Sequence, residues 1–370
     1  MFINLEMSFH SAKFRGDFMG DTAIRSKCLA IAQCHFLNTP YKKVPITDLY
    51  KIGGIANKAS RICHYCTIDT LAAILENSCL RFTDVRFLND STEFLEAIKL
   101  IEWVLRSKRY LSRYSQEFKQ FILYSKELHD LESYTQSYIG FSRKERAVKK
   151  ISYHTYTCSF STNLDSLSMW NYYGVTSAGL NVVFDFAWNL FEGSEETEVN
   201  IGKTLENDIV IYRGLILYSD KQKEQCIVEL LDKLFELFEE AKENLETYKD
   251  IILYAFKESV NNMRCFFKNE AFSCEEEYRV VLKIPEELLL KKEKSYDCKI
   301  LKKGTFRRGN VLIPYIDYQF QKESIVGITI NPYEKREDEI LQIGLENLLW
   351  MHGLQNVSIV HSAIPIRKYD

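Results

Sequence analysis

The chain has 370 residues, of which 46% are hydrophobic and 13% aromatic, enough to bury one large core or two modest ones. A formal net charge of -3 provides no global attraction to nucleic acid or membranes, so such a partner must be met by a local patch. With ten scattered cysteines, no signal-peptide pattern and no run of roughly 20 apolar residues, we expect a folded cytoplasmic protein with mostly free thiols and no membrane partner.

Residues 1–58 are predicted to form an N-terminal helical extension with one helix over 22–36, whose apolar face includes Ile24 and Cys28. A strand is expected at 61–67 and carries His64. Thr67 is well placed to cap the helix that follows over 68–77. The pattern therefore predicts a strand that leads directly into a helix.

The remaining pattern predicts short strands separated by helices of unequal length. Asn89 and Asp90 are capping candidates for a helix that continues to about residue 105. A short helix is expected after Thr162 and another over 336–350. Strands are predicted at 80–83, 153–161, 178–186, 209–218, 275–284, 311–318, 325–330 and 357–367. Because strands and helices do not alternate regularly, the fold class is α+β.

Residues 59–370 are interpreted as a single α+β domain that carries two helical insertions. The first, at about 108–150, is aromatic and increasingly basic. The second, at about 219–265, has an apolar stripe at helical spacing, which is typical of core or helix-pair packing.

The stretch 266–279 is where long helical periodicity stops and a polar-faced strand is expected. A strand that begins at Glu275 places Glu275, Glu277 and Arg279 on one face, with apolar residues on the other. This pattern fits a strand that lines a catalytic site. It also fits a salt-bridged surface strand, and the residues alone leave both alternatives open.

Several familiar sites are absent from the sequence, including a phosphate-binding Walker loop, a Gly-x-Gly-x-x-Gly turn and a His-Glu-x-x-His helix. Cys63 and Cys66 form a single pair whose sulfurs point to opposite faces of a strand, so no metal site is predicted. The remaining candidate is a set of polar and aromatic residues that is spread over several predicted strands. Its members are His64, Ser159, Ser161, Trp170, Tyr172, Tyr173, Glu275 and Glu277, each of which also has an ordinary structural explanation.

Five short blocks in order make the chain resemble the bacterial family known as domain of unknown function 2971, over roughly residues 61–367. The blocks are His64-Tyr65; Arg86 to Asp90 with Glu93; Cys158 to Ser161 with Asp165, Met169, Trp170 and Tyr173; Phe267-Lys268 with Phe272, Glu275, Glu277, Tyr278 and Arg279; and Ser362 with Ile364, Pro365 and Arg367.

The order of these motifs is also similar to that of ADP-ribosyltransferases, which bind NAD without a Rossmann fold. This resemblance implies a mixed, mostly antiparallel sheet, with NAD as substrate. It implies catalytic roles for Glu277, on the nicotinamide ribose, and Glu275, on the acceptor. The implied NAD contacts are His64, Tyr65, Ser159, Ser161, Trp170, Tyr173 and Arg279. Arg279 has two open roles, which are to hold a phosphate or to lock Glu277.

The expected function is therefore an NAD-dependent ADP-ribosyltransferase-like enzyme or NAD glycohydrolase, in the setting of a toxin or antiviral defence effector with a regulatory or antitoxin partner. The acceptor would be protein or nucleic acid, and the basic stretches 143–150 and 291–308 either guide a nucleic acid or form a solvated surface. The alternatives are a nucleotide- or nucleic-acid-binding module without catalysis, and a metal-dependent nuclease using Asp90, Glu93, Glu275 and Glu277.

Overall fold

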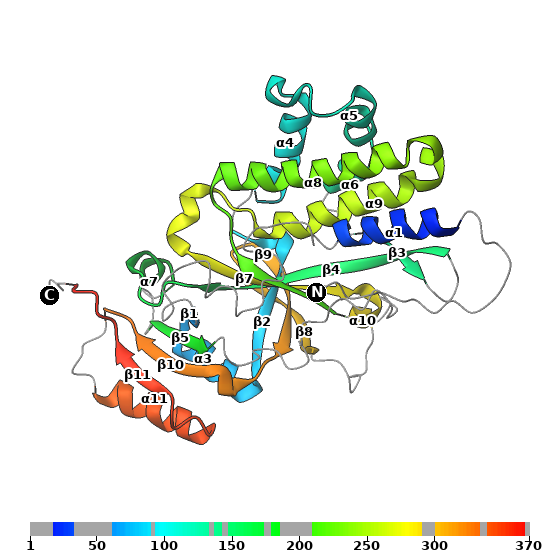
Figure 1. Ribbon diagram of the computed structural model, residues 1–370. Helices are drawn as coiled ribbons and strands as arrows, with labels where there is room; N and C mark the ends of the chain where they lie inside the picture. Colours follow the sequence, from blue (N-terminus) through cyan, green and yellow to red (C-terminus); the bar gives the residue numbers. More distant parts are fainter. Residues whose placement is uncertain are drawn as a thin grey trace.

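The computed structural model describes residues 18–32, 61–89, 93–132, 137–142, 147–173, 179–185, 209–290, 300–333 and 339–366. They form an α+β fold around a mostly antiparallel sheet (Figure 1). Its strands are β1 (Arg61–Thr67), β2 (Cys79–Asp84), β3 (Ser137–Ser142), β4 (Ala147–Ser161), β5 (Gly179–Asp185), β6 (Val210–Leu215), β7 (Glu277–Pro285), β8 (Ile300–Arg308), β9 (Val311–Gln319), β10 (Ile325–Ile330) and β11 (Ser358–His361). The fold class predicted from the sequence is confirmed.

Some of the helices form a layer over one part of the sheet, and the others lie apart from this layer. The helices are α1 (Phe18–Ala32), α3 (Ile68–Asn77), α4 (Glu93–Arg106), α5 (Gln116–Leu123), α6 (Lys126–Glu132), α7 (Leu167–Tyr173), α8 (Asp220–Glu240), α9 (Leu245–Met263), α10 (Glu286–Leu290) and α11 (Glu339–Met351). Figure 1 shows α1, α8 and α9 together on one side of β4 and β7, with α11 at the far end of the molecule beside β11.

The strand order β11-β10-β5-β1-β4-β2-β9-β8 makes β4 the branch point of the sheet. One edge of β4 pairs with β7 from Tyr153 to Ser161. The other edge pairs with β1 at Ser161 and with β2 at Thr157 and Tyr156. Ser159 therefore lies between the two partners, at the point where β1 and β2 diverge. The ring of His64 occupies this point, with its Nδ1 3.0 Å from the carbonyl oxygen of Ser159.

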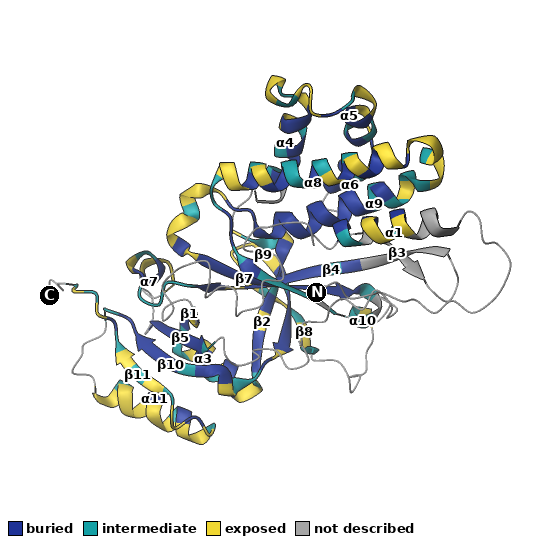
Figure 2. Cartoon of the chain, viewed as in Figure 1, coloured by how far each residue is buried: buried dark blue, intermediate teal, exposed yellow. Residues whose placement is uncertain are grey.

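Three apolar clusters hold these elements together. The largest joins α1, α4, α5, α6, α8 and α9, and β7 contributes Val281 to it. The second lies on the other side of the sheet and includes Leu282 and residues of α3 and α11. A small third cluster packs Trp170 of α7 onto Tyr65 of β1. Figure 2 shows the result, in which β7 and most of the described part of β4 are buried and α11 is largely exposed. Every residue of β7 is buried, so this strand is internal.

Most of the predicted elements are confirmed. Strand β8 was not predicted, and the strand predicted at 357–367 is only Ser358–His361. Two further predictions are wrong. The helix 22–36 is α1, which begins four residues earlier and packs into the largest cluster; the rest of 1–58 lies outside the described residues. The insertion 108–150 is helical only as far as Glu132, because 137–142 and 147–150 pair as the antiparallel strands β3 and β4. The second insertion consists of the two helices α8 and α9.

The second error concerns the start of β7. Glu275 ends a 3-10 helix (Glu270–Glu275), and Glu276 adopts a left-handed conformation with φ 43°. The strand begins only at Glu277. A left-handed residue is uncommon outside glycine and reverses the chain direction locally, which ends the 3-10 helix and starts the strand.

Candidate functional site

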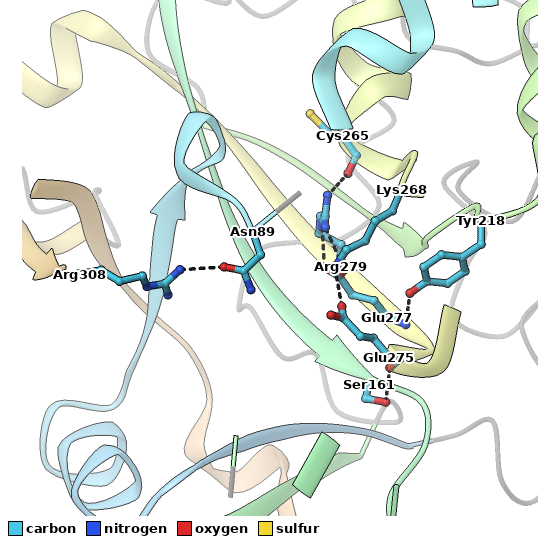
Figure 3. Close-up of polar contacts among 9 residues, drawn as sticks. All are labelled: Asn89, Ser161, Tyr218, Cys265, Lys268, Glu275, Glu277, Arg279 and Arg308. Carbon is cyan, nitrogen blue, oxygen red and sulfur yellow. Dashed lines mark hydrogen bonds and ion pairs between the residues drawn. The ribbon is translucent and has the colours of Figure 1, made fainter. Parts of the chain in front are cut away.

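Four charged side chains from two segments meet on the face of β7 that lies under the helical layer (Figure 3). Lys268 Nζ lies 2.5 Å from Glu275 Oε2 and 3.0 Å from Glu277 Oε2. Arg279 holds Glu277 with two parallel hydrogen bonds, Nε to Oε1 at 2.7 Å and Nη2 to Oε2 at 2.9 Å. All four residues are at most 7% exposed. We call Lys268, Glu275, Glu277 and Arg279 the charge cluster.

Local structure places each member of the charge cluster. Glu277 and Arg279 are two residues apart in a strand, so their side chains share a face. Lys268 follows the buried Phe266 and Phe267, and its segment pairs with Leu217 through backbone hydrogen bonds of 2.8 and 3.2 Å. This pairing fixes the chain after α9 beside β7 and aims Lys268 at the two carboxylates.

Glu277 has no acceptor capacity left for a ligand. Its carboxylate receives two hydrogen bonds from Arg279, one from Lys268 and one from the Ser159 hydroxyl. A carboxylate offers about four lone-pair sites. Burial alone would raise the pKa of Glu277, but the charges of Arg279 and Lys268 and these hydrogen bonds lower it to about 2. Glu277 is therefore ionised at neutral pH and fully paired.

Of the two roles considered for Arg279, the structure shows the lock on Glu277. Its Nη1 also donates to the carbonyl oxygen of Cys265 at 2.6 Å, and the residue is 1% exposed. A guanidinium that is buried and paired in this way is not placed to bind a phosphate.

Glu275 differs from Glu277 in one respect that matters chemically. Among the described residues, Lys268 is the donor to its carboxylate, on Oε2, and Oε1 has no donor. Its backbone is anchored, since the buried Ser161 hydroxyl donates to the Glu275 carbonyl oxygen at 2.7 Å. Glu275 is thus a held carboxylate with one oxygen still able to accept a hydrogen bond.

Solvent reaches the sheet face beside the charge cluster at Ser159. This residue is exposed, although its neighbours Cys158 and Phe160 on β4 are buried. It pairs with Arg279 in the β4–β7 ladder. Ser159 contacts Glu277 and Ser161 anchors the backbone of Glu275, and of these two serines only Ser159 is accessible. Their expected contacts with NAD stay a prediction.

Tyr173, at the end of α7, is an accessible aromatic residue of this region. It is 40% exposed. Burial of its hydroxyl raises the pKa of Tyr173, and the nearby charge of Glu275 raises it further, whereas Lys268 and Arg308 act in the opposite direction. The ring therefore lies near the charge cluster and also near Arg308. Arg308 Nη1 donates to Asn89 Oδ1 at 2.9 Å (Figure 3).

His64, Tyr65 and Trp170 have structural partners. Burial lowers the pKa of His64, and the hydrogen bond with the Ser159 carbonyl opposes this effect. The Tyr65 hydroxyl donates to Asn163 O and accepts from Ser166 N, both at 2.9 Å. Trp170 is fully buried, and its Nε1 donates to Asp165 Oδ1 at 2.8 Å. Among these three residues, only His64 borders the exposed Ser159.

The other candidate residues from the sequence are not shown to belong to this site. Cys63 and Cys66 lie in different apolar clusters, on opposite faces of β1, as predicted. Within the described residues there is no group of three or more His, Cys, Asp or Glu side chains that could hold a metal ion. Asp90 lies outside the described residues and so does the side chain of Glu93, which the nuclease alternative requires. The basic stretch 143–150 is also largely undescribed.

Sequence reasoning assigned no role to Lys268, Asn89 or Arg308 in this site. Lys268 belongs to the Phe267-Lys268 block, but its spacing from Glu275 in the sequence does not predict that the two side chains form an ion pair. Arg308 was noted only as the last residue of a basic stretch. Contacts between Arg308 and Asn89, 219 residues apart, are set by the sheet and leave no local signal.

Comparison with known proteins supports the family resemblance over part of the chain. Residues 169–280 match the family model described as "Protein of unknown function (DUF2971)". The DUF2971 match contains Trp170, Tyr173 and the whole charge cluster, and it leaves out His64, Ser159 and Arg308. No curated protein and no solved structure matches the chain. In the described part of the chain, none of the helices is long and apolar enough to cross a membrane.

Proposed function

We propose that this protein cleaves the bond between nicotinamide and ribose in NAD, as an ADP-ribosyltransferase-like enzyme. The observation that carries the proposal is Glu275 Oε1, a carboxylate oxygen that has no donor among the described residues, on a side chain that lies near the exposed ring of Tyr173. The order of motifs first suggested this chemistry, and the geometry of the charge cluster supports it with one change of roles.

Glu275 is the residue to which we assign the reaction. As nicotinamide leaves, the ribose carbon C1′ acquires positive charge, and a nearby carboxylate stabilises this charge only in the transition state. Water or a macromolecular acceptor then attacks C1′. Nicotinamide departs as a neutral molecule, and one proton is released. Lys268 fixes the carboxylate of Glu275 for this role.

Glu277, which the motif order placed first, becomes a positioning residue in this proposal. It binds Lys268, and Lys268 binds Glu275. Its own carboxylate is saturated, so a direct hydrogen bond to the ribose would require one of four existing partners to leave. The carboxylate with spare capacity is the better candidate for substrate contact.

Tyr173 and Arg308 complete the proposed NAD site. The exposed ring of Tyr173 offers a face to the cationic pyridinium, an attraction of roughly 0.5 to 2 kcal/mol. Arg308 is exposed and near Tyr173, so it takes the phosphate-binding role that was open for Arg279. His64 contributes by holding the backbone of Ser159.

The test is to incubate the purified protein with NAD and measure free nicotinamide, together with the thermal shift that NAD produces. We expect NAD to raise the melting temperature and nicotinamide to be released. Absence of both effects would refute the proposal.

A second candidate is a nucleotide-binding module that breaks no bond. The observation in its favour is that Lys268, Glu277 and Arg279 are hydrogen-bonded to one another, as expected of residues with a purely structural role. An NAD-induced thermal shift without nicotinamide release, in wild type and in the presence of candidate acceptors, would favour this alternative.

A further inference from the structure

Strand β8 forms one edge of the sheet and is strongly basic. It carries four exposed cations, Lys302, Lys303, Arg307 and Arg308, and no acidic residue. A protein of net charge -3 thus concentrates positive charge on one edge strand.

The register of the sheet divides these cations between two faces. Lys302 pairs with Asp317 of β9, which pairs with Arg81 of β2, and Thr83 of β2 pairs with Thr157 of β4. Because residues two apart in a strand share a face, Lys302 and Arg308 lie on the same face as Ser159. Lys303 and Arg307 lie on the opposite face.

The face shared with Ser159 combines cations and aromatic rings. Arg81 stacks on Tyr315, with its guanidinium carbon 3.8 Å from the ring centroid, and its charge is matched by Asp317 at 2.9 Å. The half-buried Phe306 lies between Lys302 and Arg308 and contacts Tyr315. Lys302 and Arg308 supply positive charge beyond the Arg81–Asp317 pair.

This basic face leads to the proposed NAD site. Its last member, Arg308, is near Tyr173, and the next residue to Tyr173 on α7, Tyr172, is 69% exposed. Arg308 thus connects the basic face of β8 to the exposed aromatic residues at the end of α7, near Glu275.

We propose that the acceptor of the ADP-ribose is a single-stranded nucleic acid bound along this face of β8, which we call the β8 track. The assignment rests on the proposed NAD cleavage. Cations attract the phosphates, whereas bases stack on exposed aromatic rings such as Tyr172 regardless of sequence. In the transfer, a nucleophilic atom of the nucleic acid forms a bond to C1′ of the ribose. The bond from C1′ to nicotinamide breaks, and the acceptor gives up one proton.

A single strand fits better than a duplex because the reacting carboxylate is recessed. Glu275 is only 7% exposed, so a base must leave any stack to bring its atoms to C1′. An unpaired strand has already lost its base pairing and can turn a base inward at lower cost.

Another explanation for the cations is protection of the edge strand, since charged side chains prevent pairing with other chains. Protection of the edge requires charge anywhere along the strand, so cations on either face would serve equally. Binding along the β8 track requires the cations on the face that carries Lys302. Lys302 and Lys303 are adjacent, exposed and identical in charge, and they point to opposite faces, so they form a matched pair for testing.

The experiment measures binding of fluorescent single-stranded DNA and RNA to the full-length protein by anisotropy, at 50 and 200 mM salt and without NAD. We expect wild type to bind single strands more tightly than duplex. Lys302→Glu should weaken binding on the order of tenfold and reduce the salt slope by about one. Lys303→Glu should bind as wild type does.

Three results would overturn the β8 track: no binding of single strands at 50 mM salt, equal binding of duplex, or equal loss in the Lys302 and Lys303 variants. With labelled NAD, transfer of label to protein and not to nucleic acid would also contradict it. Since the binding assay omits NAD, its outcome is independent of nicotinamide release, and failure of the proposed function can be told apart from failure of the track.

Discussion

Arg279 and Glu277, two residues apart on one buried strand, form a bidentate ion pair with distances of 2.7 and 2.9 Å. The sequence showed both residues but could not decide between a catalytic carboxylate and a structural ion pair. The geometry assigns the pair to the interior, where removing one partner breaks a buried ion pair.

Glu277→Gln should destabilise the protein by about 3 kcal/mol or more, because it breaks the buried ion pairs of Glu277 with Arg279 and Lys268. Equilibrium urea unfolding measures this difference. Glu276→Gln is the matched control, since Glu276 is adjacent and exposed, and it should change stability by less than about 0.5 kcal/mol. Equal stability of the Glu277 variant and wild type would show that the pair is not formed.

The low pKa of Glu277 also predicts a pH dependence. A carboxyl whose pKa falls from 4.5 to about 2 on folding stabilises the protein above pH 4.5, and this contribution is lost as the pH falls toward 2. Its size is about 3 kcal/mol. The stability difference between wild type and Glu277→Gln, measured from pH 6 to pH 3, should therefore be constant above about 4.5 and shrink below it. A difference that does not change with pH would contradict the assigned pKa.

Tyr173→Ala should weaken NAD binding by roughly 2- to 30-fold, the range expected when a ring facing a cation is removed. Tyr173→Phe should bind nearly as wild type, because the ring face is kept. Isothermal titration calorimetry provides the comparison, with Tyr124→Ala as control, since Tyr124 is 78% exposed and lies at the end of α5. Equal affinity of the Ala and Phe variants for NAD would show that the ring of Tyr173 does not contact NAD.

The helix α1 should contribute to global stability. Ile31 and Cys28 lie in the largest apolar cluster, and the Ser259 hydroxyl of α9 donates to the Ile31 carbonyl oxygen at 2.5 Å. Ile31→Ala should cost about 2 to 4 kcal/mol. Thermal and urea unfolding test this value, and a loss below about 0.5 kcal/mol would mean that α1 is a dispensable extension.

Elements determined by local chemistry were predicted well from the sequence. The strand 61–67, its cap Thr67 and the helix 68–77 match the structure residue by residue, because a threonine hydroxyl at the cap and an apolar face at helical spacing act within a few residues. The strand 325–330 is likewise confirmed, being bounded by Asn331 and Pro332.

Elements determined by distant partners were not predicted. The segments 137–142 and 147–150 carry side chains compatible with a helix, and they become strands by pairing with each other. The start of β7 depends on the left-handed backbone of Glu276, and a glutamate in the sequence gives no reason to predict this conformation. Glu275 and Glu277 differ because Arg279 and Ser159 bond Glu277 alone. Both glutamates meet Lys268, whose segment is held in place by Leu217.

The most direct test of the central claim compares nicotinamide release from NAD by wild type, Glu275→Gln and Glu276→Gln. Glu275→Gln should stay folded, since Lys268 keeps Glu277 as a partner, and should lose at least about 100-fold in rate, whereas Glu276→Gln should match wild type. If Glu275→Gln releases nicotinamide as fast as wild type, the assignment of Glu275 as the catalytic carboxylate is wrong.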